Sequence, residues 1–192
     1  MNDRSSAPLA DYLAALAAPT PAPGGGSAAA ICAAAAAALV EMVAGLSLER
    51  DPNGADAVRQ RAAIATASAA RTHLAMLANE DEAAYGAFIA ALRLPKGDDA
   101  ARATRSDALS RAALIAAQVP LRVIQACADV AEAASSLANR TVAAAASDLE
   151  AALRLSASAA HISAENVEAN LPYVESADER VGIANACAAA LT

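Results

Sequence analysis

The sequence has almost no aromatic side chains. Its 192 residues include three tyrosines, one phenylalanine and no tryptophan. Alanine takes their place, with 63 residues, about a third of the chain. Alanine is the strongest helix former, but it adds little apolar area when it is buried. We therefore expect close-packed helices whose small core is supplemented by an interface with a second subunit.

Positive charge is also scarce, with 14 Lys and Arg against 21 Asp and Glu and a net charge of −7. This balance excludes nucleic-acid binding, which needs a basic surface, and no basic amphipathic run suits a membrane surface. The apolar run over residues 28–40 ends at Glu41 and is too short to span a bilayer. The N-terminus lacks a basic segment followed by an apolar one, so we expect no signal peptide and a cytoplasmic protein.

Cysteine and histidine are few and widely separated. Cys32, Cys127 and Cys187 form no CxxC pair. We expect them to be small buried apolar residues in a reducing compartment, and not a disulfide set or a zinc site. His73 and His161 have no carboxylate or cysteine at metal-ligand spacing, so no metal site is expected.

Strand patterns are missing as well, and proline and glycine divide the chain into helices. Pro120 stands inside one of them and is expected to kink or break it at 118–120. Short connections make sequential helices antiparallel neighbours. We predict an all-α protein, an elongated up-and-down bundle of long Ala-rich helices, as a single domain over residues 1–192. The expected helices cover residues 7–18, 27–47, 51–92, 98–138, 142–171 and 176–191, and Asp98 is expected to cap the fourth.

A stretch rich in proline and glycine, "PTPAPGGGSAAA", precedes the second predicted helix. One interpretation is a turn in which Ser27 caps the helix. The other is a ligand site, because a helix N-terminus presents unpaired N–H groups and glycine lets a ligand approach the backbone. The residues alone leave both open.

An acidic cluster at residues 79–82 is followed by Tyr85. Such a cluster usually forms a solvated face. Asp81, however, lies on the same helical stripe as the apolar Leu77, Tyr85 and Phe88. A carboxylate that points inward has a movable pKa, which suits acid–base chemistry.

Two further polar pairs stand out. Ser147 and Asp148 are poor residues for a helix interior, so they mark either a helix start with an N-cap or a site. Asn166 and Asn170 lie one helical turn apart and can present donors and acceptors to a planar heterocycle. Asn170 can equally serve as a helix C-cap.

The stretch "PTPAPGGGSAAAICAAAAAALVEMV" resembles the opening motif of the cyclodeaminase/cyclohydrolase family. That family includes the C-terminal domain of formiminotransferase-cyclodeaminase and stand-alone methenyltetrahydrofolate cyclohydrolases. The similarity continues in order through "DEAAYGAFIAALRLPK" (81–96), "VPL" (119–121) and "SDLEAALRLSASAAHISAENVEANL" (147–171). It spans about residues 20–171, and a series of separate motifs is more specific than any one of them.

The resemblance implies a helical homodimer that takes a tetrahydrofolate derivative as substrate near the glycine turn, with no bound cofactor. It implies either a cyclodeaminase, which closes formiminotetrahydrofolate to methenyltetrahydrofolate and releases ammonia, or a cyclohydrolase, which opens methenyltetrahydrofolate with water. We expect the cyclohydrolase, because no formiminotransferase domain is attached. The implied catalytic residues are Asp81 and Asp148, and the implied substrate-binding residues are Pro23, Gly24, Gly25, Gly26, Ser27, Tyr85, Asn139, Ser147, Asn166 and Asn170.

The chain departs from the family pattern in two places. In "SLERDPNGAD" (47–56), only Arg50 remains of the basic and aromatic residues usual there. In "LANRTVAAAASD" (137–148), Ala138 and Asn139 stand where Gly-Asn is usual. Two alternatives therefore stay open: an enzyme of the same fold that acts on a non-folate amidine or imine, and a non-catalytic helical dimer.

Overall fold

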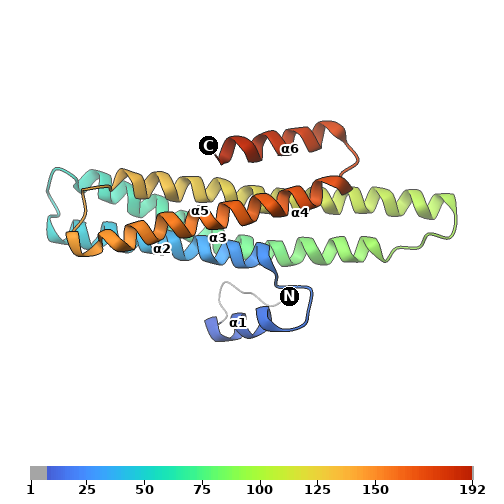
Figure 1. Ribbon diagram of the computed structural model, residues 1–192, viewed down its shortest axis with the longest axis horizontal. Helices are drawn as coiled ribbons and strands as arrows, with labels where there is room; N and C mark the ends of the chain where they lie inside the picture. Colours follow the sequence, from blue (N-terminus) through green and yellow to red (C-terminus); the bar gives the residue numbers. More distant parts are fainter. Residues whose placement is uncertain (1–7, 192) are drawn as a thin grey trace.

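The computed structural model describes residues 8–191 and is helical throughout (Figure 1). No strand occurs within this range, which confirms the predicted all-α fold. Residue 7, where we expected the first helix to begin, lies outside the described residues. The elements are α1 (Leu9–Ala17), α2 (Gly25–Arg50), α3 (Ala57–Leu92), α4 (Asp99–Ser136), the 3₁₀ turn η1 (Ala143–Ala145), α5 (Ala146–Asn170), the 3₁₀ turn η2 (Leu171–Tyr173) and α6 (Ala177–Ala190).

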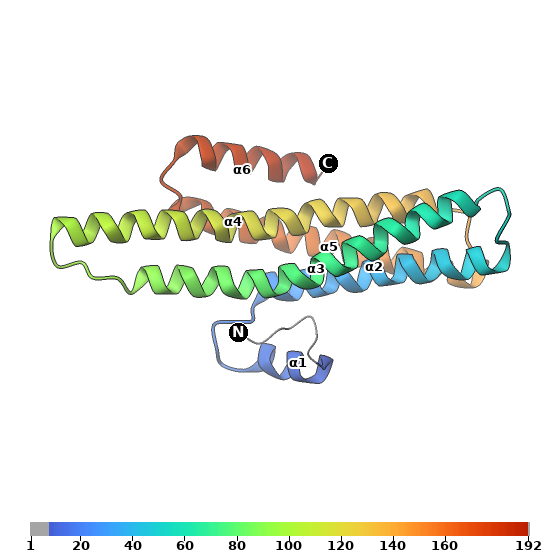
Figure 2. The same cartoon turned by 180° about the vertical axis from the view of Figure 1, so that it is seen from behind.

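Helices α2 to α5 form an elongated up-and-down bundle (Figures 1 and 2). Helix α2 packs on α3 and α5, and α4 packs on the same two helices. Sequential helices are therefore antiparallel neighbours, as the short connections predict. The hairpin of α3 and α4 extends beyond the start of α2, as both views show.

Alanine builds the centre of this bundle. Ala33, Ala37, Val40 and Ala44 repeat at helical spacing along α2 and are completely buried. Their small side chains let neighbouring helices approach closely. Larger side chains fill the space opposite them, and Leu74 and Leu77 of α3 and Val130 of α4 are also fully buried.

Two predicted helix boundaries change in the structure. Helix α4 runs without a break from Asp99 to Ser136 with Pro120 buried inside it, so the predicted break at 118–120 is wrong. Proline removes one backbone hydrogen bond, and the long flanking segments packed on α3 and α5 hold the helix together. Asp98 caps this helix as expected, since its Oδ1 accepts from Ala101 N at 2.7 Å. Helix α3 begins at Ala57 and not at 51, because residues 52–56 form turns.

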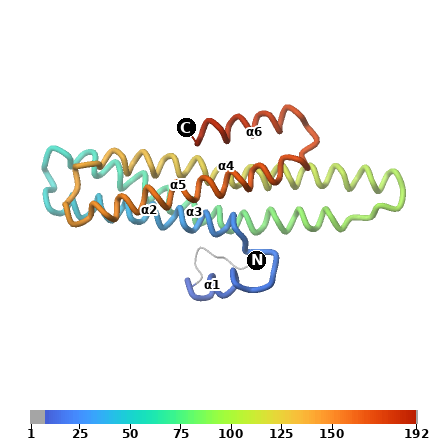
Figure 3. The backbone as a smooth tube through the Cα atoms, in the orientation of Figure 1, coloured from blue at the N-terminus to red at the C-terminus, as the bar shows by residue number. Residues whose placement is uncertain are grey.

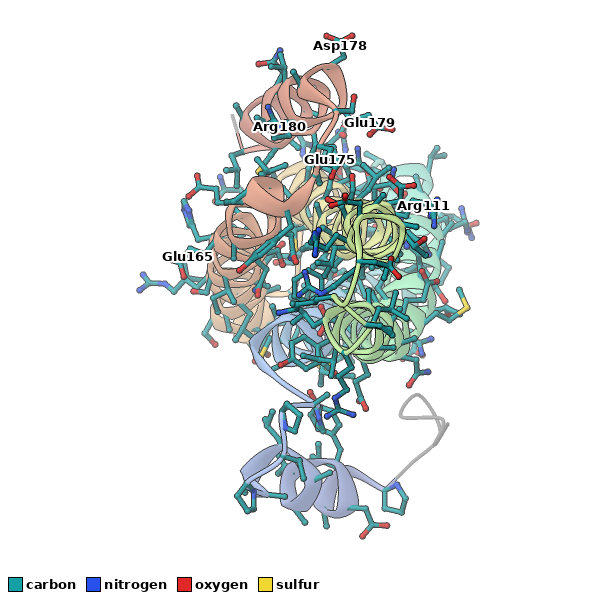
Figure 4. All side chains as sticks on the ribbon, turned by 90° about the vertical axis from the view of Figure 1, so that its right-hand side faces the viewer. Arg111, Glu165, Glu175, Asp178, Glu179 and Arg180 are labelled. Carbon is teal, nitrogen blue, oxygen red and sulfur yellow. The ribbon has the colours of Figure 1, made fainter. Side chains whose placement is uncertain are left out.

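The two terminal helices lie on opposite sides of the bundle (Figures 3 and 4). Ser176 caps α6 by accepting from Glu179 N at 3.2 Å. Arg180, labelled in Figure 4, donates to the Glu175 carbonyl oxygen at 3.0 Å, and Glu175 N donates to Ser110 Oγ of α4 at 2.9 Å. These bonds fix the segment that joins α5 to α6.

Two of the three cysteines behave as predicted. Cys127 and Cys187 are buried free thiols, whereas Cys32 is exposed on α2, so its predicted burial is wrong. Within residues 8–191, α2 and α4 are long and apolar enough to cross a membrane by length and composition alone. In each helix, half of the residues in the most apolar 18-residue segment are buried inside the bundle, and the core helix of a soluble protein passes the same test.

Candidate functional site

The N-terminus of α2 faces a carboxylate from α3. Gly24 is the N-cap residue of α2. As a glycine it has no side chain that could supply a capping oxygen. Asp81 supplies one instead, because its carboxylate accepts the backbone N–H of Ser27. A negative charge is favourable at this end of a helix. Asp81 therefore points inward, and the interpretation of this residue as part of a solvated face is wrong.

Gly26 is required by this contact. A Cβ atom built on Gly26 would lie 2.2 Å from Oδ1 of Asp81, so any other residue here would force the Asp81 carboxylate to shift. The same construction on Gly24 and Gly25 meets only open space or an ordinary contact. Gly26 therefore leaves room for the Asp81 carboxylate beside the backbone of α2. One interpretation of the sequence had been that the glycines leave room for a ligand.

Burial raises the pKa of Asp81 above its ordinary value of 3.8. The hydrogen bond from Ser27 N–H lowers the pKa, and the neighbouring charge of Glu82 raises it further. Burial is the largest of the three effects, so Asp81 holds a proton at higher pH than a solvated aspartate does. A carboxyl group of this kind can both carry a proton and pair with a buried cation.

Two amide side chains of α5 complete the polar lining. Asn166 Nδ2 donates to the Ile162 carbonyl at 2.8 Å, and Asn170 Nδ2 donates to the carbonyls of Asn166 at 2.8 Å and Ala116 at 3.3 Å. These bonds turn the Oδ1 atoms away from the helix backbone, and no described residue donates to them. The pocket therefore presents two amide oxygens together with a carboxylate, a set that attracts N–H groups and positive charge.

All four aromatic residues of the chain gather around this pocket. Tyr85 and Phe88 line it, and the rings of Phe88 and Tyr173 meet edge to face with centroids 5.0 Å apart. Tyr12 of α1 is buried, and its hydroxyl oxygen lies 3.2 Å from Ser27 Oγ. Burial raises the pKa of Tyr12, so it stays a neutral phenol. The cavity itself is small, about 190 Å³.

The structure brings most of the predicted site residues together. The cavity is lined by seven of them, and Pro23 and Ser27 are buried directly beside it. Sequence reasoning did not assign Tyr12, Phe88, Ala116 or Tyr173 to the site. The scarcity of aromatic residues was the signal that could have found three of these. The seven predicted residues in the lining are Gly24, Gly25, Gly26, Asp81, Tyr85, Asn166 and Asn170.

Three predicted residues lie at the other end of the bundle. Asn139 is in the turn after α4 with a φ of 59°, and Ser147 and Asp148 are in the first turn of α5. This region packs on the end of α2, since Val142 N donates to Ser47 Oγ at 3.1 Å. Ser47 is 21 residues from Gly26 along α2, or about 30 Å. Within one chain these three residues take no part in the Asp81 pocket.

The capping interpretations are also wrong. Ser27 is the third residue of α2 and its hydroxyl meets Tyr12, so it does not cap the helix. Ser147 is the second residue of α5, where Ala145 is the N-cap and no side chain accepts a capping bond. Asn170 has a right-handed backbone with φ −90°, and not the left-handed conformation of a glycine-like C-cap. In residues 8–191, no three His, Cys, Asp or Glu side chains form a group that could hold a metal ion.

These features define an all-α helical bundle with a half-buried carboxylate, two amide side chains and aromatic rings around a small cavity at one end. The sequence matches the family model described as formiminotransferase-cyclodeaminase over residues 8–189, so the chain belongs to that family. No curated protein matches it. The fold is similar to that of a formiminotetrahydrofolate cyclodeaminase from Thermotoga maritima, with a TM-score of 0.86 and 24% identity over 96% of this chain and 88% of the other.

Proposed function

We propose that the Asp81 pocket binds a tetrahydrofolate derivative and that the protein converts formiminotetrahydrofolate to methenyltetrahydrofolate and ammonia. The placement of Asp81 carries this proposal: a half-buried carboxylate on a helix N-terminus that lines a pocket with two amide side chains. The family match and the similarity to a solved cyclodeaminase support it. That similarity favours ring closure over the cyclohydrolase reaction expected from the sequence.

The charge of the pocket suits the reacting group. A protonated formimino group and the methenyl bridge that it becomes are both cations delocalised over nitrogen and carbon. A carboxylate held in a water-poor site stabilises such a cation. The Oδ1 atoms of Asn166 and Asn170 accept N–H groups of the heterocycle, and Tyr85 and Phe88 cover its faces. The small volume encloses the heterocyclic head and leaves the rest of the ligand outside.

The reaction needs one proton transfer that Asp81 can serve. The second folate nitrogen attacks the formimino carbon and forms a tetrahedral intermediate, while that nitrogen loses its proton. The proton moves to the amino group, which then leaves as ammonia, and the methenyl cation remains. Because burial raises the pKa of Asp81, the carboxyl group holds this proton more readily than a solvated aspartate does and can pass it to the amino group.

Asp148 can act in this reaction only from a second chain. A homodimer with a two-fold axis perpendicular to the helices places the far end of one bundle beside the glycine turn of the other. The exposed side of α2 offers apolar area for such contact, with Met42 41% and Leu46 45% exposed. We propose this antiparallel homodimer, in the cytoplasm, with Asp148 and Ser147 of one chain near the Asp81 pocket of its partner.

The activity is tested by supplying formiminotetrahydrofolate and methenyltetrahydrofolate separately and following the methenyl absorbance. Absorbance that appears faster than in buffer with the first compound supports the cyclodeaminase. Accelerated loss of absorbance with the second supports the cyclohydrolase instead. No acceleration with either compound, together with no calorimetric binding of a tetrahydrofolate, contradicts a folate enzyme and favours a non-folate amidine or a non-catalytic dimer.

The shared site is tested by mixing two inactive variants. Asp81→Asn and Asp148→Asn chains are unfolded together and refolded, so that mixed dimers form. If the two residues act across the interface, each mixed dimer regains one intact site and activity returns. If activity stays absent, or if Asp148→Asn alone is fully active, the role proposed for Asp148 is contradicted.

A further inference from the structure

A second cavity lies at the far end of the bundle, where α2 ends and α3 begins. Its volume is about 580 Å³, three times that of the Asp81 pocket. Ser47, Arg50 and Asp51 line it from the end of α2, Asp56 and Gln60 from the start of α3, and Arg140 from the turn before α5. None of these residues has a part in the function proposed above.

Gln60 is the most unusual residue of this cavity. Its side chain is only 5% exposed, and its Nε2 donates to the Arg140 carbonyl at 3.1 Å. Its Oε1 is buried and has no hydrogen-bond donor among residues 8–191. A buried carbonyl oxygen without a donor is destabilising, so such an atom is normally paired in the working protein. A ligand in this cavity can supply the missing N–H group.

The charges around Gln60 divide into paired and unpaired groups. Arg140 Nη1 pairs with Asp56 Oδ1 at 3.0 Å, which holds the turn before α5 against the start of α3. Arg50 and Asp51 line the same cavity, and no described residue forms an ion pair with either. The cavity therefore holds one available cation and one available carboxylate beside the buried Gln60 oxygen.

We propose that this cavity binds a small zwitterion with an ammonium group and a carboxylate, the chemistry of a free amino acid. The ligand carboxylate pairs with the Arg50 guanidinium, which can hold both of its oxygens. The ammonium group donates to Gln60 Oε1 and faces Asp51. The Ser47 hydroxyl is not available to the ligand, because it donates to the Val43 carbonyl at 2.8 Å and accepts from Val142 N.

A ligand with one charge fits this set of groups less well. A plain carboxylate leaves Gln60 Oε1 without a donor and lies near Asp51. A plain amine leaves Arg50 unpaired. Only a molecule with both groups satisfies the cation and the acceptor together, so the cavity discriminates by the simultaneous presence of two groups.

The experiment measures binding to the full-length protein by calorimetry and by amide shifts in NMR spectra. The probes are L-alanine, L-glutamate, propionate, which lacks the ammonium group, and ethylamine, which lacks the carboxylate. We expect at least one amino acid to bind about tenfold more tightly than propionate and ethylamine, with shifts at Gln60 and Arg50. The proposal is overturned if none of the probes binds at millimolar concentration, since the orphan oxygen then holds only water. Equal binding of alanine and propionate also overturns it.

Two variants test the contacts, and a third serves as a control. The Arg50 side chain is exposed, so Arg50→Met should leave the melting temperature unchanged. It should weaken amino-acid binding at least about tenfold, because it removes the guanidinium that pairs with the ligand carboxylate. Gln60→Met removes the acceptor oxygen from a side chain of similar length, so it should weaken amino-acid binding and leave propionate binding unchanged, even if Gln60→Leu fails to fold. Arg93→Met removes an exposed arginine at the other end of α3 and should change nothing. If Arg50→Met and Arg93→Met bind alike, the cavity is not the site.

Discussion

The two ends of the bundle are built from the same four helices and differ in nearly every chemical respect. The glycine-turn end has a small cavity lined by two aromatic rings, with the other two rings of the chain nearby, and by one half-buried carboxylate and two amide side chains. The far end has a larger cavity without aromatic residues in its lining, edged by two arginines and two aspartates. The first suits a planar cation and the second a flexible charged molecule. The comparison shows that one Ala-rich bundle holds two cavities of different chemistry, one toward each end of α2.

The largest expected effect is on turnover in Asp81→Asn, which removes the charge of the Asp81 side chain and keeps its shape. Asp81→Asn keeps an oxygen that accepts the Ser27 N–H, but it removes the charge and the titratable proton. We expect turnover to fall at least about 100-fold with the melting temperature nearly unchanged. Glu165→Gln, on the exposed side of α5, is the control and should retain full activity. Near-normal turnover in Asp81→Asn would show that the carboxylate serves only as a cap for α2.

A second prediction contrasts two glycines of the same helix. Gly26→Ala places a Cβ against the Asp81 carboxylate, so we expect about 1–3 kcal/mol of lost stability together with lost activity. Gly45→Ala meets nothing within 4 Å and replaces a mid-helix glycine, so it should gain roughly 0.5–1 kcal/mol. Urea unfolding of both variants measures the difference. Equal stabilities would mean that Asp81 does not occupy the space beside Gly26.

A third prediction concerns the aromatic wall. Phe88→Leu keeps an apolar side chain but loses the edge-to-face contact with Tyr173 and the flat surface beside the ligand. We expect about a fivefold to tenfold rise in KM with little change in kcat, since such ring contacts contribute about 0.5–1.5 kcal/mol. Phe88→Tyr should remain close to the wild type. If kcat falls and KM does not, the ring acts on the reacting group and not on binding.

The smallest expected effect is on the pH dependence of stability. Burial raises the pKa of Asp81 in the folded chain, so between 3.8 and that raised pKa the folded chain holds a proton that the unfolded chain has released. The contribution of Asp81 to the free energy of unfolding therefore decreases as pH rises through this window. Asp81→Asn lacks the decrease, so its stability relative to the wild type should rise as pH increases from the ordinary aspartate pKa of 3.8 through the raised pKa of Asp81. A constant difference would mean that the pKa is not raised.

Much of this architecture was predictable because it rests on local rules. Alanine content, the proline and glycine breaks and the Asp98 cap predicted the helices and their antiparallel order. Pro120 misled the prediction, because tertiary packing holds α4 together where propensity alone would break it. The start of α3 was missed because the turn residues before it also resemble a helix start.

The site was predictable only in its residue types. Asp81, Asn166 and Asn170 were identified from helical spacing and from the family resemblance. The role of Gly26 could not be predicted. Gly26 lies 55 residues from Asp81 in the sequence, and only the packing of α2 on α3 brings the two residues together. Sequence motifs also gave no sign that Asn139, Ser147 and Asp148 lie at the far end, because order along the chain does not show which end of a helix a motif occupies.

The most direct test of the account asks which end of the bundle binds a folate. A stable tetrahydrofolate, 5-formyltetrahydrofolate, is titrated into isotope-labelled protein and the backbone amide shifts are followed by NMR. The account predicts the largest changes at Gly24–Gly26, Tyr85, Phe88 and Asn166, and their loss in Asn166→Leu. Shifts confined to residues 47–60 and Arg140, with the glycine turn unaffected, would contradict it.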